Sequence, residues 1–213
     1  MPKKRSQLLS MQMMTQIALF ATIAFILSFF RVSLPIFPGF LQFDLVDVPI
    51  IVGALLFGPI AGILILVVNL LLYLAIVGSR TYGIGSLVNF LLGSSYVLAL
   101  CFVHNRVKGF KGLVAGATVA SLAATLMAAT VNYTFVIRAF ASFFGGMQTI
   151  INMTSAIHPA INSLESIVLF SIIPFNLMKF LVASTAAIVL YKAIVKTIPA
   201  ITSLRNRTLK KSE

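Results

Sequence analysis

The chain has 213 residues, of which 60% are hydrophobic and only 9% are charged, and its mean hydropathy is +1.07. A soluble domain has about 45 to 50% apolar and roughly 25% charged residues, so this composition excludes a soluble globular protein. One bilayer crossing takes about 20 residues, which leaves room for a handful of helices and no sizeable soluble domain. The predicted class is an all-α integral membrane protein.

The basic residues are distributed as in a membrane protein, so no nucleic-acid partner is expected. The net charge of +12 arises from 16 Lys and Arg against 4 Asp and Glu. Twelve of the basic residues lie in four stretches that flank apolar segments, which is typical of loops on the cytoplasmic side. These twelve are Lys3, Lys4, Arg5, Arg106, Lys108, Lys111, Lys192, Lys196, Arg205, Arg207, Lys210 and Lys211.

The first two apolar segments differ in length. Residues 8–30 follow a basic start, are long enough to span, and lack a small-residue cleavage site, so they are interpreted as a transmembrane helix and not a removed signal peptide. The second segment, residues 49–57, cannot cross about 30 Å of hydrocarbon at about 1.5 Å per residue. We therefore expect it to pack inside the protein, after a long outer loop.

Four further helices are predicted. Gly58-Pro59 restarts the chain into a third helix at 59–77, because proline suits a first helical turn. The fourth and fifth helices are expected at 83–103 and 112–137. Residues 138–173 are interrupted by Gly145-Gly146, His158-Pro159 and Glu165, which predicts a second long outer loop with short helical pieces. Pro174 is expected to open the last helix, 174–195, before a basic tail at 196–213.

Six crossings place both ends of the chain and the loop at 106–111 on one side of the membrane. All twelve flanking basic residues then share that side, so both termini are predicted to be cytoplasmic, in a bacterial plasma membrane.

Catalysis is poorly supported by the sequence. The chain has four acids and two histidines, and it contains none of the motifs of intramembrane proteases, such as His-Glu-x-x-His. Its single cysteine, Cys101, forms no Cys-x-x-Cys metal motif. The sequence therefore predicts no enzyme and no metal site.

Polar residues within apolar segments are the best binding candidates, because such groups are costly in lipid and usually face a bundle interior. Asn89, Asn132, Asn176 and Lys179 lie toward the outer ends of the last three helices, and the first loop brings Asp44 and Asp47 to the same side. Two alternatives remain open. The amides, with Asn69, could instead join helices by hydrogen bonds, and Lys179 could extend to the interface.

Two other groups have alternative interpretations. The aromatic residues of the outer side could line a flat ligand or form an interfacial belt; they are Phe43, Tyr73, Tyr82 and Tyr133. Small residues in the first helix allow close helix approach, either within the chain or to a partner subunit. These are Ala18, Ala21, Thr22 and Ala24.

Three stretches resemble the substrate-binding S components of energy-coupling factor (ECF) vitamin transporters. That family has a first loop, a short second helix and a Gly-Pro entry to the third helix that resemble LPIFPGFLQFDLVDVPIIVGALLFGPIAGILI. Its fourth and sixth helices are similar to RTYGIGSLVNFLLG and IIPFNLMKFLVASTAAIVLYKAI. Pro-Phe-Asn-x-x-Lys at 174–179 and Asp-x-x-Asp-x-Pro at 44–49 look most like the riboflavin-specific branch.

The resemblance implies a six-helix vitamin carrier with no cofactor of its own. Its partners would be a transmembrane coupling protein and two ATPase subunits that use the ATP. By position, Asn132, Asn176 and Lys179 would hydrogen-bond riboflavin, while the first loop with Phe43, Asp44 and Leu45 would close over it. Another vitamin, such as pantothenate, pyridoxine or a thiamine precursor, remains an alternative, as does a structural membrane subunit without a ligand.

Overall fold

The computed structural model describes residues 11–78, 83–107 and 109–197. Tyr82 and the ends of the chain, including most of the predicted basic tail, lie outside these residues. Four of the described helices are long and apolar enough to span a membrane, and two apolar helices are shorter. With one pair of two-residue strands, this is the all-α membrane architecture that the composition predicts.

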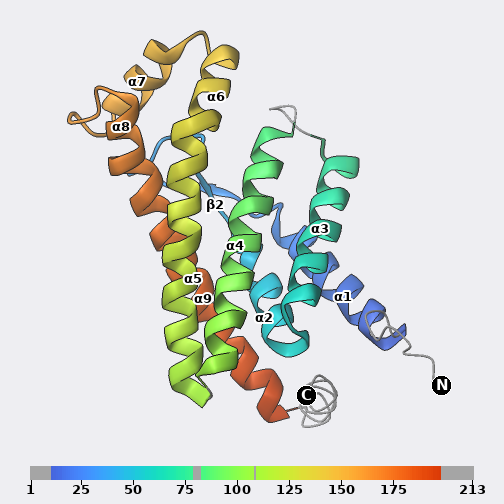
Figure 1. Ribbon diagram of the computed structural model, residues 1–213. Helices are drawn as coiled ribbons and strands as arrows, with labels where there is room; N and C mark the ends of the chain where they lie inside the picture. The colour runs from blue at the N-terminus through green and yellow to red at the C-terminus, as the bar shows by residue number, and fades with distance from the viewer. Residues whose placement is uncertain (1–10, 79–82, 108, 198–213) are drawn as a thin grey trace, which may run out of the picture.

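Figure 1 shows the helices and strands of the described residues, coloured in chain order. They are α1 (Met11–Leu27), β1 (Val32–Ser33), β2 (Gln42–Phe43), α2 (Asp47–Phe57), α3 (Pro59–Ile76), α4 (Ile84–Arg106), α5 (Gly109–Val131), η2 (Asn132–Val136), α6 (Ile137–Phe143), α7 (Met147–Ser155), α8 (Leu164–Ile167), η3 (Val168–Ile172) and α9 (Ile173–Thr197).

The short helix α2 lies in the middle of the bundle. Every residue from Val48 to Leu56 is buried, and the helix contacts α1, α3, α4 and α9. A helix of 11 residues is too short to cross the hydrocarbon alone, but here protein surrounds its ends. The expectation that this segment packs inside the protein is confirmed.

The last two spanning helices are longer than predicted. The fifth helix continues through the π-helical segment η2 into α6 and ends at Phe143, so only part of the predicted outer loop is irregular. The last helix begins at Leu164, where Ser163 and Ser166 form a capping box.

α9 begins at Ile173, one residue before Pro174, so the predicted start of this segment lies close to the observed one. The spanning helix as a whole begins earlier, at Leu164, and continues through Pro174. Proline has no backbone N–H to give to the carbonyl one turn earlier and normally disrupts an α-helix. Here the π-helical segment η3 ends just before Pro174 and shifts the hydrogen bonding from i−4 to i−5. The widened turn lets the helix continue through the proline.

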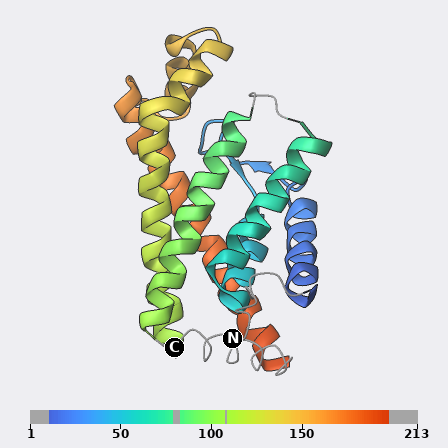
Figure 2. The same cartoon turned by 45° about the vertical axis from the view of Figure 1, so that its right-hand side comes forward.

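The described elements that adjoin the basic segments lie at one end of the bundle. The start of α1, the α4–α5 connection and the end of α9 lie at the same end, opposite α6, α7 and α8 (Figure 1, Figure 2). At that end the Lys192 ammonium lies 3.7 Å from the centre of the Phe110 ring, which joins α9 to the start of α5.

Small residues set the spacing of the bundle. On α3, a Cβ added to Gly62 would lie 2.6 Å from the Ala54 Cβ and 3.0 Å from Val97 Cγ1, so α2, α3 and α4 meet at this glycine. On α5, Ala120, Ala124 and Ala128 are fully buried. Such residues let helix backbones approach closely, which is the main source of helix association in lipid.

Gly62→Ala is expected to lower the stability by about 1–3 kcal/mol, because the added methyl group overpacks a three-helix contact. The midpoint of thermal unfolding in detergent, followed by circular dichroism, measures this change. Gly39→Ala is the matched control, because an added Cβ there meets nothing within 4 Å. Equal midpoints for the two variants would contradict the packing described for Gly62.

Candidate ligand-binding site

The first loop folds back on itself and brings two distant charges together. β1 and β2 pair antiparallel, with Val32 opposite Phe43 and Ser33 opposite Gln42. The same register, continued by one residue, places Arg31 opposite Asp44. Directly opposed residues in an antiparallel pair are neighbours. The Arg31 Nε lies 3.7 Å from Asp44 Oδ2. The loop then enters α2 at Asp47, so both carboxylates are held near the centre of the bundle.

Lys179 of α9 binds both carboxylates. Its Nζ lies 3.1 Å from Asp44 Oδ1 and 3.2 Å from Asp47 Oδ2. The side chains of Lys179, Asp44 and Asp47 are only 11%, 7% and 13% exposed. The Lys179 side chain therefore does not extend to the membrane–water interface, and this alternative interpretation of Lys179 is excluded. The convergence of the first loop with the last helix follows from the need of a buried ammonium for counter-charges.

Arg31 extends this group of charges to α3. One guanidinium nitrogen donates a hydrogen bond of 2.9 Å to the Tyr73 hydroxyl, and the guanidinium carbon lies 4.5 Å from the centre of the Tyr73 ring. We call Arg31, Asp44, Asp47 and Lys179 the charge cluster. Two cations balance two carboxylates in it. No role in the site was predicted for Arg31 from the sequence, because only the pairing of β1 with β2 brings it to Asp44.

Asn132 is the first residue of the π-helical segment η2, and Asn176 lies in α9, shortly after the π-helical segment η3. Each donates a side-chain N–H to the carbonyl four residues earlier, Asn132 to Ala128 at 2.8 Å and Asn176 to Ile172 at 2.9 Å. Both are buried, and η2 and η3 are in contact. An amide has a second N–H and an oxygen, so each side chain retains hydrogen-bonding capacity. π-helical segments occur frequently at functional sites.

An apolar cavity of about 320 Å³ lies between the first loop, α6 and α7. The first loop and the α5–α6 helix supply residues both to this cavity and to the polar groups described above. Small-molecule sites are mostly apolar with a few fixed polar groups, and these shared elements provide both. The lining residues are Pro38, Gly39, Phe40, Ile137, Phe140, Phe144, Ile150 and Met153.

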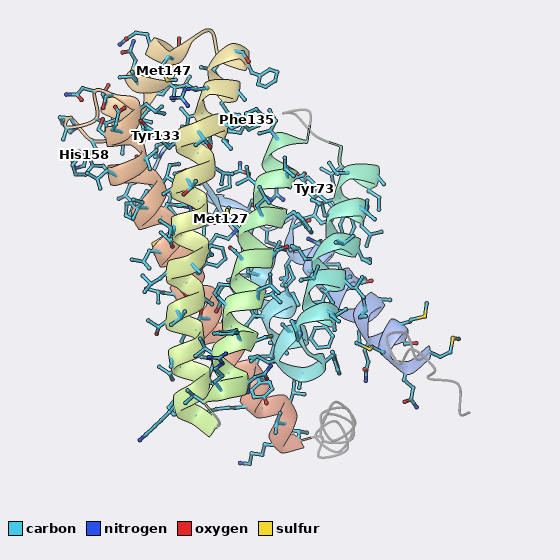
Figure 3. All side chains as sticks on the ribbon, viewed as in Figure 1. Tyr73, Met127, Tyr133, Phe135, Met147 and His158 are labelled. Carbon is cyan, nitrogen blue, oxygen red and sulfur yellow. The ribbon has the colours of Figure 1, made fainter. Side chains whose placement is uncertain are left out.

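Other predicted site residues are not brought into the charge cluster. Phe43 is half-buried on β2, Leu45 is 39% exposed, and Asn89 is exposed on α4. Tyr133 is 42% exposed, and its ring lies 5.6 Å from the Arg138 guanidinium, as in an interfacial belt. Tyr73 and Tyr133 lie in the half of the molecule that holds α7 (Figure 3). Tyr82 lies outside the described residues.

The small residues of α1 separate into two pairs. Ala21 and Ala24 are fully buried against neighbouring helices of the same chain, so their predicted role in partner binding is wrong. Ala18 and Thr22 are exposed, four residues apart on one face of the helix. Only the second pair is available to another subunit, because the first faces α2 and α3.

Lys179→Met is expected to lower the stability by about 3–5 kcal/mol, because it leaves the Asp47 carboxylate buried without its cation. Adding Asp47→Asn should recover at least half of the loss, since an amide carries no charge. The thermal unfolding midpoints in detergent measure both effects. Adding Glu165→Gln instead removes an exposed carboxylate and should recover nothing. Equal recovery in both double variants would contradict the pairing.

Comparison with known proteins agrees with this arrangement. The family model for the ECF transporter substrate-specific component matches residues 12–191. The chain is 31% identical over 179 residues to the riboflavin transporter RibU of Staphylococcus aureus strain TCH60, covering 84% of this chain and 87% of the relative. It is 28% identical over 169 residues to the riboflavin transporter FmnP of Bacillus subtilis strain 168, covering 78% and 83%.

A solved S component of a bacterial ECF transporter has the same fold, with a TM-score of 0.68 at 27% identity, covering 88% of this chain and 97% of that chain. The resemblance seen in the sequence is confirmed. The chain belongs to the substrate-specific components of ECF transporters, so it is a multi-pass membrane transport protein that associates with other ECF components and is not an enzyme.

Proposed function

We propose that this chain is the riboflavin-binding subunit of an ECF-type importer. Two relatives that it matches over most of their length are riboflavin transporters. The observation that carries the proposal is the burial of Asn132, Asn176 and Lys179 on two adjacent helices, beside a loop that also lines an apolar cavity. Riboflavin is a flat, largely apolar ring with a polar edge and a chain of hydroxyl groups, and this mixture of surfaces suits it.

Each polar group has a role in this proposal. The amides of Asn132 and Asn176 exchange hydrogen bonds with the polar edge of the ring or with the hydroxyl chain. Lys179 donates to a carbonyl or hydroxyl oxygen. The first loop closes over the ligand, held by the ion pairs of Asp44 with Arg31 and Lys179. Phe43, on β2 of the same loop, covers the site from outside.

The charge cluster argues against an anionic vitamin. Considered from the sequence alone, a lone Lys179 would also suit pantothenate by charge pairing. The two carboxylates at 3.1 and 3.2 Å already neutralise this ammonium. A third carboxylate would be repelled by both in a buried setting. Uncharged vitamins remain outcomes of the binding test.

Transport requires partners in this proposal. Binding occurs from outside, both termini are cytoplasmic, and a transmembrane coupling protein with two ATPase subunits supplies the energy from ATP. The basic residues at the α4–α5 connection and at the end of α9 support this orientation, because Lys and Arg favour the cytoplasmic side.

Protein purified in detergent without added ligand is expected to be yellow and to release riboflavin in stoichiometric amount, as measured by visible absorption and mass spectrometry. Asn132→Ala and Asn176→Ala should each weaken riboflavin binding by about 1–3 kcal/mol, since ligand groups lose buried partners. Asn105→Ala is the matched control, because it removes an exposed amide at the C-terminal end of α4, away from Asn132 and Asn176. Isothermal titration of ligand-free protein gives the affinities.

Other results would change the proposed ligand, the proposed role or the proposed site. Colourless protein carrying another vitamin would replace the ligand and keep the carrier role. Protein that binds no member of a vitamin panel would indicate a structural subunit. Unchanged riboflavin affinity in both asparagine variants would rule out the site described above.

Ala18→Leu and Thr22→Leu should reduce riboflavin uptake several-fold without changing the affinity of the purified protein. Leucine adds bulk on the exposed small face of α1, where a partner helix would approach closely. Thr118→Leu is the control, because Thr118 is also exposed and also bonds the carbonyl four residues earlier, but lies on α5. Uptake in cells that express the ECF partners measures the effect. Normal uptake in both α1 variants would exclude this face as the docking surface.

A further inference from the structure

Among the described residues, two cations lie over exposed aromatic rings where the end of α4, the start of α5 and the end of α9 come together. The Arg106 guanidinium carbon lies 4.2 Å from the centre of the Phe102 ring, one turn earlier on α4. The Lys192 ammonium of α9 lies 3.7 Å from the centre of the Phe110 ring on α5. We call these four residues the cation–ring surface. We propose that this surface binds anionic phospholipids by their headgroups.

The positive charge at this end of the bundle has no acidic partner within residues 11–78, 83–107 and 109–197. Of the three acids in these residues, Asp44 and Asp47 belong to the charge cluster, and Glu165 lies on α8 at the opposite end (Figure 1). A counter-charge therefore has to come from outside the described chain. The exposed basic residues of this end are Arg106, Lys111, Lys192 and Lys196.

The rings lie where a lipid would contact them. Phe102 and Phe110 are 58% and 57% exposed, near the ends of two helices that are long and apolar enough to span a membrane. An exposed apolar ring in this place contacts acyl chains, while Lys and Arg direct their charges toward the membrane surface. The face of the ring attracts the cation and holds it at that level. The positive-inside rule explains basic residues on this side, but it does not require a ring beneath them.

The chemistry of the surface matches an amphiphile with a negative head. A phosphodiester accepts charge-assisted hydrogen bonds from guanidinium and ammonium groups, and the attached acyl chains cover the rings. A choline headgroup brings its own cation, so a zwitterionic lipid gains less from the same contacts. Basic surfaces between spanning helices on the cytoplasmic side are typical sites for anionic headgroups. An acidic segment of a protein partner would match the cations but not the lipid-facing rings.

The test measures lipid binding to the full-length protein in detergent by native mass spectrometry. Phosphatidylglycerol and phosphatidylcholine with the same acyl chains are the two probes. The native protein should bind phosphatidylglycerol at least tenfold more tightly. Arg106→Gln and Lys192→Gln should each lower this preference about fivefold, which is the effect of one basic residue near an anionic membrane surface.

Arg138→Gln is the matched control for charge. It also removes an exposed cation that lies near a ring, 5.6 Å from the centre of Tyr133, but in the outer half of the molecule. Its lipid preference should equal that of the native protein. An equal loss in Arg138→Gln and Lys192→Gln would indicate a general effect of net charge and overturn the proposal.

A variant of the ring separates a defined site from diffuse charge. Phe110→Ala keeps every charge, but it should lower the preference for phosphatidylglycerol about threefold, because Lys192 loses the ring that holds it. Phe135→Ala is the control, since Phe135 is 52% exposed and lies in the outer half (Figure 3). An unchanged preference in Phe110→Ala would show that the charges act without a defined surface and would contradict the proposal.

Two results with the native protein alone would also overturn the inference. One is equal affinity for the two lipids, which needs no variant and so keeps the proposal testable if a variant does not fold. The other is displacement of phosphatidylglycerol by an equal concentration of inorganic phosphate, which would indicate a site for a free anion and not for a lipid. Neither result depends on riboflavin binding, so the proposed function is tested separately.

Discussion

A buried ammonium requires counter-charges, and the arrangement of the outer half of the molecule depends on that requirement. Lys179 lies within the last helix with 11% of its side chain exposed, and lipid offers it no solvation. Asp44 in the first loop and Asp47 at the start of α2 supply the counter-charges for this ammonium. One set of ion pairs therefore positions the loop, orients the short helix and joins both to the last helix. The same contacts that stabilise the fold also form the candidate site.

The short helix and the π-helical segments are connected with this arrangement. Because α2 has 11 residues, its first residue lies inside the bundle, where Asp47 can reach α9. A helix of full spanning length would carry Asp47 to the membrane surface. The segments η2 and η3 likewise interrupt regular hydrogen bonding where Asn132 and Asn176 lie. Irregular backbone inside a membrane protein is tolerated where protein surrounds it, and here it accompanies the polar side chains.

Charge balance connects stability with selectivity. A pair of carboxylates around one ammonium is a costly way to stabilise a membrane protein, since each ion loses its hydration. Retaining Lys179, Asp44 and Asp47 in the interior is consistent with a role in recognition as well as in folding. A cluster without net charge leaves hydrogen-bonding groups in place for a ligand but offers no attraction to an anion, which separates this site from the phosphate-binding sites that rely on unpaired Arg and Lys.

Composition, spacing and local motifs determined the class, the family and most helices, because apolar runs of spanning length and Gly-Pro breaks are local signals. They also determined that Asp44, Asp47 and Lys179 lie on the same side. Tertiary structure decided the rest. Whether Lys179 is paired, which alanines of α1 are buried, and whether Pro174 interrupts a helix all depend on what packs against them. Arg31 became part of the site only through the register of β1 with β2, since contacts between residues distant in the chain are set by the packing of whole elements.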